Sequence, residues 1–255
     1  MIPKVIHYCW FGDKKIPEQY KKFIDRWRHF CPNYTIMEWN ESNFDFNSNI
    51  YCKEAYEAKQ WAFVSDYARL KVIYEQGGVY LDTDVELIRN LDQLFVDGKG
   101  YIGFQNPYEV NTGLGFSAPR HSFVVKKMLD VYESRKFITL DGDYNRTPCP
   151  AANTVALLGL GFKTGIEESR KIQSIGDINV YPERFFNPFN SDTLEMNITS
   201  DTYSIHHYAG TWYSENAKKK AQLKRIIPNV ILRNRIKGIA QRDIKKIELE
   251  LSGEQ

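Results

Sequence analysis

The chain of 255 residues has few cysteines and no pattern that would give them a structural use. Its four cysteines, Cys9, Cys31, Cys52 and Cys149, are scattered, with no C-x-x-C pair and no Cys/His group at zinc spacing. Neither a disulfide framework nor a zinc module is indicated, so we expect free thiols in a reducing compartment.

Long apolar runs are missing as well. No stretch approaches the ~18–20 apolar residues of a membrane span, and residues 2–7 read as a strand, without a signal-peptide pattern before them. Internal repeats and low-complexity linkers are also absent. These features favour a cytoplasmic globular protein with one sizeable core.

What the chain does contain is an alternation of strand-like and helix-like segments. Residues 4–11 read as a strand, and residues 18–30 carry apolar side chains at helical spacing. Residues 34–39 form the next strand-like run, so the order at the start predicts a doubly wound α/β fold. Later segments are expected as helices over 58–76, 120–134 and 150–160 and as strands over 101–105, 178–181 and 203–207.

Residues 77–87 combine a strand-like pattern with acid. On one extended strand Tyr80, Asp82 and Asp84 would share a face, because side chains alternate along a strand. Two adjacent carboxylates repel unless a cation lies between them. Mg²⁺ and Mn²⁺ take one or two carboxylates together with phosphate oxygens, so the pair predicts a metal–diphosphate site. A solvated turn is the alternative.

The helix expected before this segment also carries unusual charges. Asp66 and Arg69 are three residues apart and lie on one helical face, the side that looks buried. The spacing alone is equally typical of a structural ion pair and of part of a site. Further along, residues 111–118 are rich in glycine and small residues, which allow a ligand to approach the backbone.

The C-terminal segment differs in charge from the rest. Between Lys218 and Lys246 eleven Lys and Arg residues face a single acid, Asp243, and apolar residues are interleaved with them. Such a basic amphipathic segment is attracted to anionic membranes by ~1 kcal/mol per basic residue. A helix that caps the core is the alternative, and nucleic-acid binding is not expected because no recognised motif accompanies the charge. We therefore divide the chain into a single domain, 1–215, and a basic amphipathic helical tail, 216–255.

Three blocks of sequence then resemble a known family. They are Ile2–Gly12 (IPKVIHYCWFG), Ala62–Arg69 (AFVSDYAR) and Gly77–Asp84 (GGVYLDTD). In this order and spacing the chain resembles the DXD-containing sugar transferases, which include yeast-type α-1,6-mannosyltransferases, capsule and exopolysaccharide glycosyltransferases and, distantly, glucosylating toxins. The likeness is close over about residues 1–120. Asn153 and residues 206–212 also match family positions.

The resemblance implies an α/β protein of the A-type glycosyltransferase fold. That fold is a Rossmann-like nucleotide-binding domain with a mixed, mainly parallel central sheet flanked by helices. It also implies Mn²⁺, or Mg²⁺, as cofactor. The implied residues are Asp66, Arg69 and Asp82 for catalysis; Tyr8, Trp10, Phe11, Asp66, Arg69, Tyr80, Asp82, Asn153, His207 and Trp212 for donor binding; and Asp82, Asp84 and His207 for the metal. Trp10 would stack on the base, and Asp84 would meet the metal most directly.

The expected activity is a retaining, metal-dependent transfer of a hexose or N-acetylhexosamine from UDP-galactose, UDP-glucose or UDP-GlcNAc. The acceptor would be a lipid-linked oligosaccharide or polysaccharide of a surface polysaccharide, reached by a tail docked on the inner membrane face. GDP-mannose is the alternative donor within this class. A toxin-like protein glucosyltransferase and a non-catalytic, Ca²⁺-dependent carbohydrate-binding protein are the other hypotheses.

Overall fold

The computed structural model describes residues 1–190, 195–208 and 229–253. Its centre is an eight-stranded sheet of order β2-β1-β3-β7-β5-β9-β8, with β6 added beside β5. These strands are β1 (Val5–Cys9), β2 (Thr35–Trp39), β3 (Gly78–Tyr80), β5 (Gly100–Asn106), β6 (Glu109–Asn111), β7 (Phe116–Ala118), β8 (Gln173–Ile175) and β9 (Ile178–Tyr181). Strands β1, β2 and β3 are parallel, β7 reverses, and β5 and β9 again follow the first direction. The mixed sheet of the expected fold class is confirmed.

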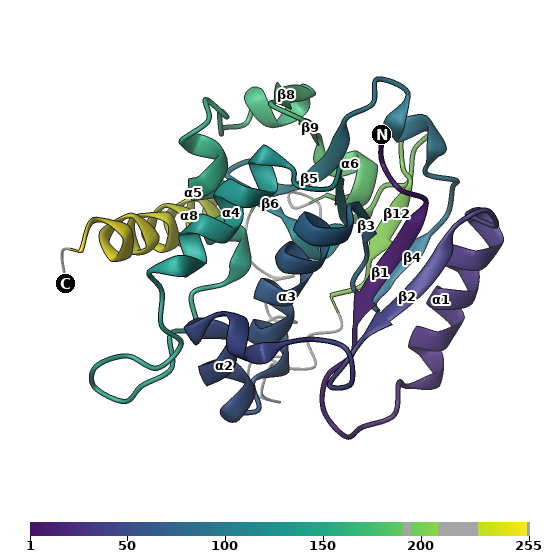
Figure 1. Cartoon of the computed structure of the whole chain (residues 1–255). Helices are drawn as coiled ribbons and strands as arrows, with labels where there is room; N and C mark the ends of the chain where they lie inside the picture. The colour runs from purple at the N-terminus through teal and green to yellow at the C-terminus, as the bar shows by residue number, and fades with distance from the viewer. Residues whose placement is uncertain (191–194, 209–228, 254–255) are drawn as a thin grey trace.

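Helices cover both faces of the sheet (Figure 1). One face carries α2 (Ile50–Glu57), α3 (Trp61–Gln76), α4 (Phe123–Glu133) and α5 (Cys149–Leu158). The other carries α1 (Glu18–Phe30), α6 (Glu183–Phe186) and a small antiparallel pair, β4 (Val85–Leu87) with β12 (Ser204–His206). The remaining pieces are the pair β10 (Phe189–Asn190) and β11 (Glu195–Met196) and the 3-10 turns η1 (Phe46–Ser48), η2 (Asp92–Phe95), η3 (Thr112–Leu114) and η4 (Glu168–Arg170).

The first strand–helix–strand unit shows how the sequence divides between the two cores. Ile6 and Tyr8 point from β1 toward α1, whereas Cys9 points to the α3 side, as the strand period requires. Helix α1 begins directly after Pro17 and buries Ile24 and Trp27. It covers the residues that its apolar spacing predicts.

The acidic segment differs from its prediction. It is not one strand: β3 ends at Tyr80, residues 82–84 form a turn, and β4 begins at Val85. Val79, Leu81 and Val85 are nevertheless fully buried in one core, as expected of that face. The chain turns because β3 belongs to the central sheet, whereas β4 pairs with β12 outside it.

A second difference is helix α2, which the sequence pattern does not predict. Asn49 begins it by accepting a hydrogen bond from the Cys52 amide at 3.2 Å. Its buried residues Tyr51 and Ala55 pack beneath α3. Residues 40–49 are mostly polar and read as a loop, so the sequence pattern does not show where α2 begins.

The tail contains helix α8 (Asn229–Ser252), which lies beside α5 (Figure 1). Ala240 and Ile247 are fully buried there, so this part of the tail does cap the core. The predicted boundary between residues 215 and 216 falls outside the described residues. Among the described helices none combines the length and apolarity that crossing a bilayer requires.

Candidate active site

The two aspartates of the Asp82-Thr83-Asp84 turn are fixed by the strands on either side. Tyr80, at the end of β3, is buried, and its hydroxyl donates to Asp82 Oδ1 at 3.0 Å. The Val85 amide donates to the Asp82 carbonyl at 2.9 Å and closes the turn. The side chains of Asp82 and Asp84 are 24% and 15% exposed. Both carboxylates are therefore held at an edge that a ligand reaches.

Helix α3 supplies a buried cation behind this turn. The Arg69 side chain is only 5% exposed, and its Nη2 lies 3.1 Å from Asp82 Oδ1 and 3.3 Å from Asp66 Oδ1. Its Nε donates to the Ser65 carbonyl at 3.1 Å, and its Nη1 donates to Cys149 Sγ at 3.7 Å. Arg69 therefore joins the predicted helix pair to the predicted metal-binding turn. Asp66 and Arg69 form an ion pair, and the same ion pair is part of the candidate site.

The charges in this cluster are strongly coupled. Burial raises the pKa of Asp66 and of Asp82 above their ordinary values, and the Arg69 guanidinium opposes that rise. Burial alone would lower the pKa of Arg69, but the neighbouring Asp82, Tyr80 and Asp66 raise it well above its usual range. Arg69 is permanently charged and stabilises two buried carboxylates.

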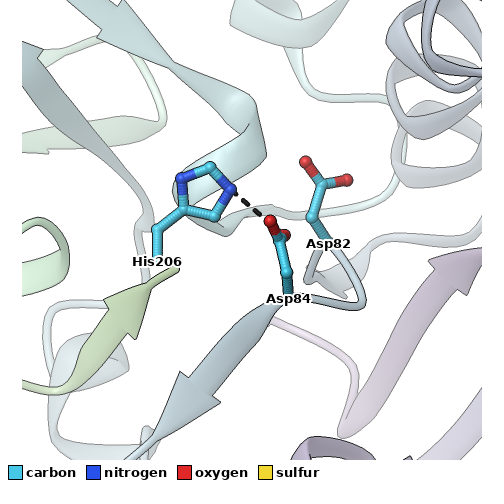
Figure 2. A group of neighbouring side chains, drawn as sticks. All are labelled: Asp82, Asp84 and His206. Atoms are coloured by element: carbon cyan, nitrogen blue, oxygen red, sulfur yellow. Dashed lines mark ion pairs between the residues drawn. The ribbon is translucent and has the colours of Figure 1, made fainter. Parts of the chain in front are cut away.

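Strand β12 brings a third ligand group to the turn. His206 pairs in register with Val85, and its Nε2 lies 3.2 Å from Asp84 Oδ1. Figure 2 shows the imidazole of His206 facing the carboxylates of Asp84 and Asp82. One ligand atom from each of the three lies within 4.8 Å of the others, and His206 Nδ1 is buried without a hydrogen-bond partner. Two carboxylates and an imidazole are a donor set that suits Mn²⁺ and tolerates Mg²⁺.

The sequence of this region matches a family model. Residues 17–99 match the glycosyltransferase sugar-binding region containing the DXD motif. The matched stretch includes Asp66, Arg69 and the Asp82-Thr83-Asp84 turn. About a third of the chain is thus similar to the sugar-binding region of DXD-motif glycosyltransferases.

Curated proteins similar to this chain agree with the match. A mannosyl phosphorylinositol ceramide synthase, CSH1, from Saccharomyces cerevisiae is 29% identical over an alignment of 148 positions that covers 54% of this chain and 38% of that protein. The chain thus spans well under half the length of this relative. An uncharacterized glycosyltransferase, L373, from Acanthamoeba polyphaga mimivirus is 24% identical and aligns over 83% of this chain and 84% of its own length.

A solved glycosyltransferase shares the fold. The PaToxG glycosyltransferase superposes with a TM-score of 0.50 over 62% of this chain and 69% of its own, at 21% sequence identity. At this identity the likeness concerns the fold, and it confirms the A-type architecture expected from the sequence.

The described geometry places His207, the predicted metal ligand, away from the two aspartates and His206 beside them. Its ring stacks on Phe23 at 4.7 Å, and its Nε2 lies 2.8 Å from Glu86 Oε2. Neighbouring side chains of a strand point to opposite sides. His206 therefore faces the aspartates, and His207 faces α1.

The predicted base-binding residues lie at the end of β1. Tyr8 is buried against Trp27 and donates to Glu38 Oε2 at 2.6 Å, and Phe11 packs in the other core. Trp10 is partly exposed, donates through Nε1 to the Lys14 carbonyl at 2.6 Å and meets Tyr20 edge-on. Of these three, Trp10 has the accessible ring, so its stacking on a base stays a prediction. Contacts of Tyr8 and Phe11 with a nucleotide also stay predictions.

Of the two remaining predicted donor-binding residues, the structure describes Asn153 but not Trp212. Asn153 is buried on α5 and donates to Thr112 Oγ1 at 3.0 Å, while its Oδ1 has no hydrogen-bond partner. Its role toward the donor stays a prediction. Trp212 lies outside the described residues.

Three members of the site escape prediction from the sequence as site residues. They are His206, Gly113 and Cys149. A Cβ on Gly113 would lie 2.7 Å from Asp82 Oδ2 and 3.1 Å from Arg69 Nη1, so only glycine fits beside the cluster. The run of small residues at 111–118 was the available signal for Gly113. Cys149, more than 60 residues after Asp84, carries none.

Proposed function

We propose that this glycosyltransferase takes its sugar from a UDP-sugar and binds the donor diphosphate through a divalent cation at Asp82, Asp84 and His206. The observation that carries the proposal is the convergence of these three ligand groups beside the buried Arg69. When bound, Mn²⁺ or Mg²⁺ would neutralise charge on the diphosphate. UDP-galactose, UDP-glucose and UDP-GlcNAc are the donors we expect.

The residues around the metal position supply the remaining chemistry. Asp82 is oriented by Tyr80 and Arg69 through Oδ1, which leaves Oδ2 for a ligand. Arg69 adds a fixed positive charge, and preorganised charge stabilises the negative charge that develops on the leaving diphosphate. Asp66 would hold a sugar hydroxyl as the ring gains oxocarbenium character. We infer transfer with retention of anomeric configuration.

GDP-mannose is the second candidate donor, because the yeast relative is named as a mannosyl phosphorylinositol ceramide synthase. The proposed site is compatible with either nucleotide, since its residues would bind the diphosphate that both donors share. A non-catalytic, Ca²⁺-dependent binding protein is a weaker hypothesis, because Ca²⁺ binding does not require a buried Arg69 between Asp66 and Asp82.

Hydrolysis of nucleotide sugars tests the proposal directly. Each of the four donors is incubated with Mn²⁺ or with EDTA, and released nucleotide is measured. We expect turnover of one donor with Mn²⁺, its loss in EDTA and at least a 100-fold loss in Asp84→Asn. Glu86→Gln is the matched control, since Glu86 follows the motif but pairs with Arg26 and His207. Turnover that is unaffected by EDTA and by Asp84→Asn would exclude the metal site.

For the acceptor, we propose a lipid-linked oligosaccharide or polysaccharide of a surface polysaccharide, reached from the cytoplasmic face of a membrane. The support lies on α8, where exposed apolar Ile231 and Ile239 accompany the exposed Arg235 and Lys237. Basic residues beside apolar ones favour an anionic lipid surface.

Binding to liposomes of phosphatidylglycerol and phosphatidylcholine tests this location. The pair Arg235→Glu/Lys237→Glu is expected to weaken sedimentation with these liposomes at least tenfold, because two attractions become repulsions. The exposed pair Lys163→Glu/Lys171→Glu changes net charge equally and is the control. Equal loss in both pairs would make the attraction a property of net charge rather than of α8.

A further inference from the structure

A second buried polar cluster is built from side chains of α2, α4 and α8 and of the residues that follow α4. Its centre is Arg135, just after α4, whose side chain is 0% exposed. The guanidinium lies over the rings of Tyr51 and Tyr132 at 5.1 Å and 5.3 Å. Its Nε lies 2.8 Å from Oε2 of Glu250 on α8, and Asn145 donates to Glu250 Oε1 at 3.0 Å.

Four polar atoms of this cluster have no hydrogen-bond partner. They are both Nη atoms of Arg135 and the hydroxyl oxygens of Tyr51 and Tyr132. Buried donors of this kind are satisfied by ordered water or by a polar neighbour in native proteins, and a charged donor most strongly requires it. The fold contacts that hold Arg135 in place therefore use only one of its three nitrogens.

The polar neighbour within electrostatic reach is the candidate active site. The Arg135 charge acts on the Asp66 carboxylate, and the Asp66 charge acts on both phenols. Asp66 belongs to a site with three carboxylates, of which Asp66 and Asp82 pair with Arg69 and Asp84 lies beside Asp82 and His206. The charge of this second buried cation relieves the excess of negative charge at Asp66.

We propose that Arg135 is a positioning residue for the glycosyltransferase site. Its free Nη atoms and the two phenol hydroxyls hold the Asp66 carboxylate in place through enclosed water, and Glu250 of α8 anchors Arg135. This inference rests on the proposed function for its kinetic consequences only. It also gives α8 a use beyond covering the core.

The charged and titratable groups around Asp66 come from every element packed against it. They are Arg69 on α3, Asp82 in the turn, Cys149 on α5, Tyr51 on α2, Tyr132 and Arg135 on and after α4, and, behind Arg135, Glu250 on α8. Of these, Arg69 and Arg135 are the cations. Removal of Arg135 thus leaves one cation for the Asp66 carboxylate.

A double-mutant cycle tests the link without any assay of activity. Arg135→Met, Asp66→Asn and the double variant are compared by Tm. We expect Arg135→Met to lower Tm clearly in the native background and at least about 3 °C less in the Asp66→Asn background, because contacting groups are not additive. Additive shifts would overturn the inference, and they would leave the proposed function untouched.

The pH dependence of donor hydrolysis is the second test. Arg135→Met is expected to move the acidic limb about one pH unit upward, because the carboxylate loses a cation, whereas Arg135→Lys keeps the limb in place. Glu250→Gln retains the hydrogen bonds but removes a negative charge, so it moves the limb slightly downward. Because the two variants should shift the acidic limb in opposite directions, the shifts distinguish an electrostatic effect of Arg135 on Asp66 from a loss of packing. If Arg135→Met does not fold, the direction of the shift in Glu250→Gln provides the test.

Arg184→Met is the matched control. Arg184 also makes an ion pair through Nε, at 2.7 Å to Asp201, and lies over the Phe185 ring at 5.1 Å, but it is exposed. Arg184→Met should leave the acidic limb of the pH profile in place, and its effect on Tm should be the same in the native and the Asp66→Asn backgrounds. An unmoved limb in all the Arg135 and Glu250 variants contradicts the inference, whereas wild-type protein that hydrolyses no nucleotide sugar contradicts the proposed function instead.

Discussion

Two adjacent histidines, His206 at the end of β12 and His207 directly after it, have opposite surroundings, and this difference decides the proposed set of metal ligands. His206 faces Asp84, whereas His207 stacks on Phe23 and pairs with Glu86. From sequence either histidine fits a family position, because the strand's phase relative to the aspartates is set by its pairing with β4. That pairing joins distant parts of the chain, so local pattern does not reveal it.

His206→Ala is expected to weaken Mn²⁺ binding at least tenfold, because it removes one of the three proposed protein ligands. His207→Ala should change it less than threefold. Titration calorimetry or Mn²⁺ EPR measures both affinities. A larger loss in His207→Ala would mean that the ligand is the other imidazole.

Gly113 marks how closely the backbone approaches the cluster. Gly113→Ala is expected to reduce donor turnover at least tenfold while Tm changes little, because the new Cβ would displace Asp82 Oδ2 or Arg69 Nη1 rather than core atoms. Gly159→Ala is the control, since its Cβ would meet its nearest neighbour at 3.6 Å, an ordinary contact. Steady-state kinetics and thermal melts of both variants provide the measurement.

At the scale of elements, the sequence predicts helices and strands correctly where apolar residues keep one regular spacing along the whole element. Helix α1 matches its predicted range because apolar residues recur on one face between Pro17 and Cys31. The acidic segment failed because Val79, Leu81, Thr83 and Val85 alternate as a single strand would. The turn among them exists for a tertiary reason, since the chain leaves one sheet for another. Helix α2 was missed although its Asn49 cap was readable.

Helix α8 contains a glycine whose replacement tests its contribution to stability. Gly238 lies in the helix interior, and a Cβ added there would have no neighbouring atom within 4 Å, so alanine fits without collision. Gly238→Ala should raise the free energy of unfolding by about 0.5–1 kcal/mol, because alanine favours helix. Chemical denaturation measures it. No gain would show that α8 unfolds separately from the core it covers.

Across the whole molecule, the buried His7 and the partly buried Glu183 give stability opposite dependences on pH. His7 accepts from Trp39 Nε1 through Nδ1 at 3.0 Å and donates to the Gly77 carbonyl at 3.0 Å, and burial lowers its pKa to about 4. Its contribution is present above pH 6.5 and is lost as pH falls toward 4. Burial raises the pKa of Glu183 to about 8, so its contribution is present below about pH 4.5 and is lost as pH rises toward 8.

Glu183→Gln is therefore expected to lose less stability than the wild type between pH 5 and pH 8.5, because glutamine stays neutral. The gap in Tm should widen by at least about 3 °C over this range. Thermal melts in matched buffers measure it, with the exposed Glu133→Gln as control. A gap that does not change with pH would show that Glu183 ionises in the folded protein at its ordinary pKa.

The pairing of β4 with β12 also affects how the protein matures on the ribosome. Glu86 and His207 are 121 positions apart, and the His206 imidazole arrives with the same strand. A nascent chain has therefore exposed both aspartates long before the third ligand is synthesised. Tight binding of Mn²⁺ at the proposed site would then require translation through β12, so a truncated product that lacks β12 is expected to bind Mn²⁺ weakly.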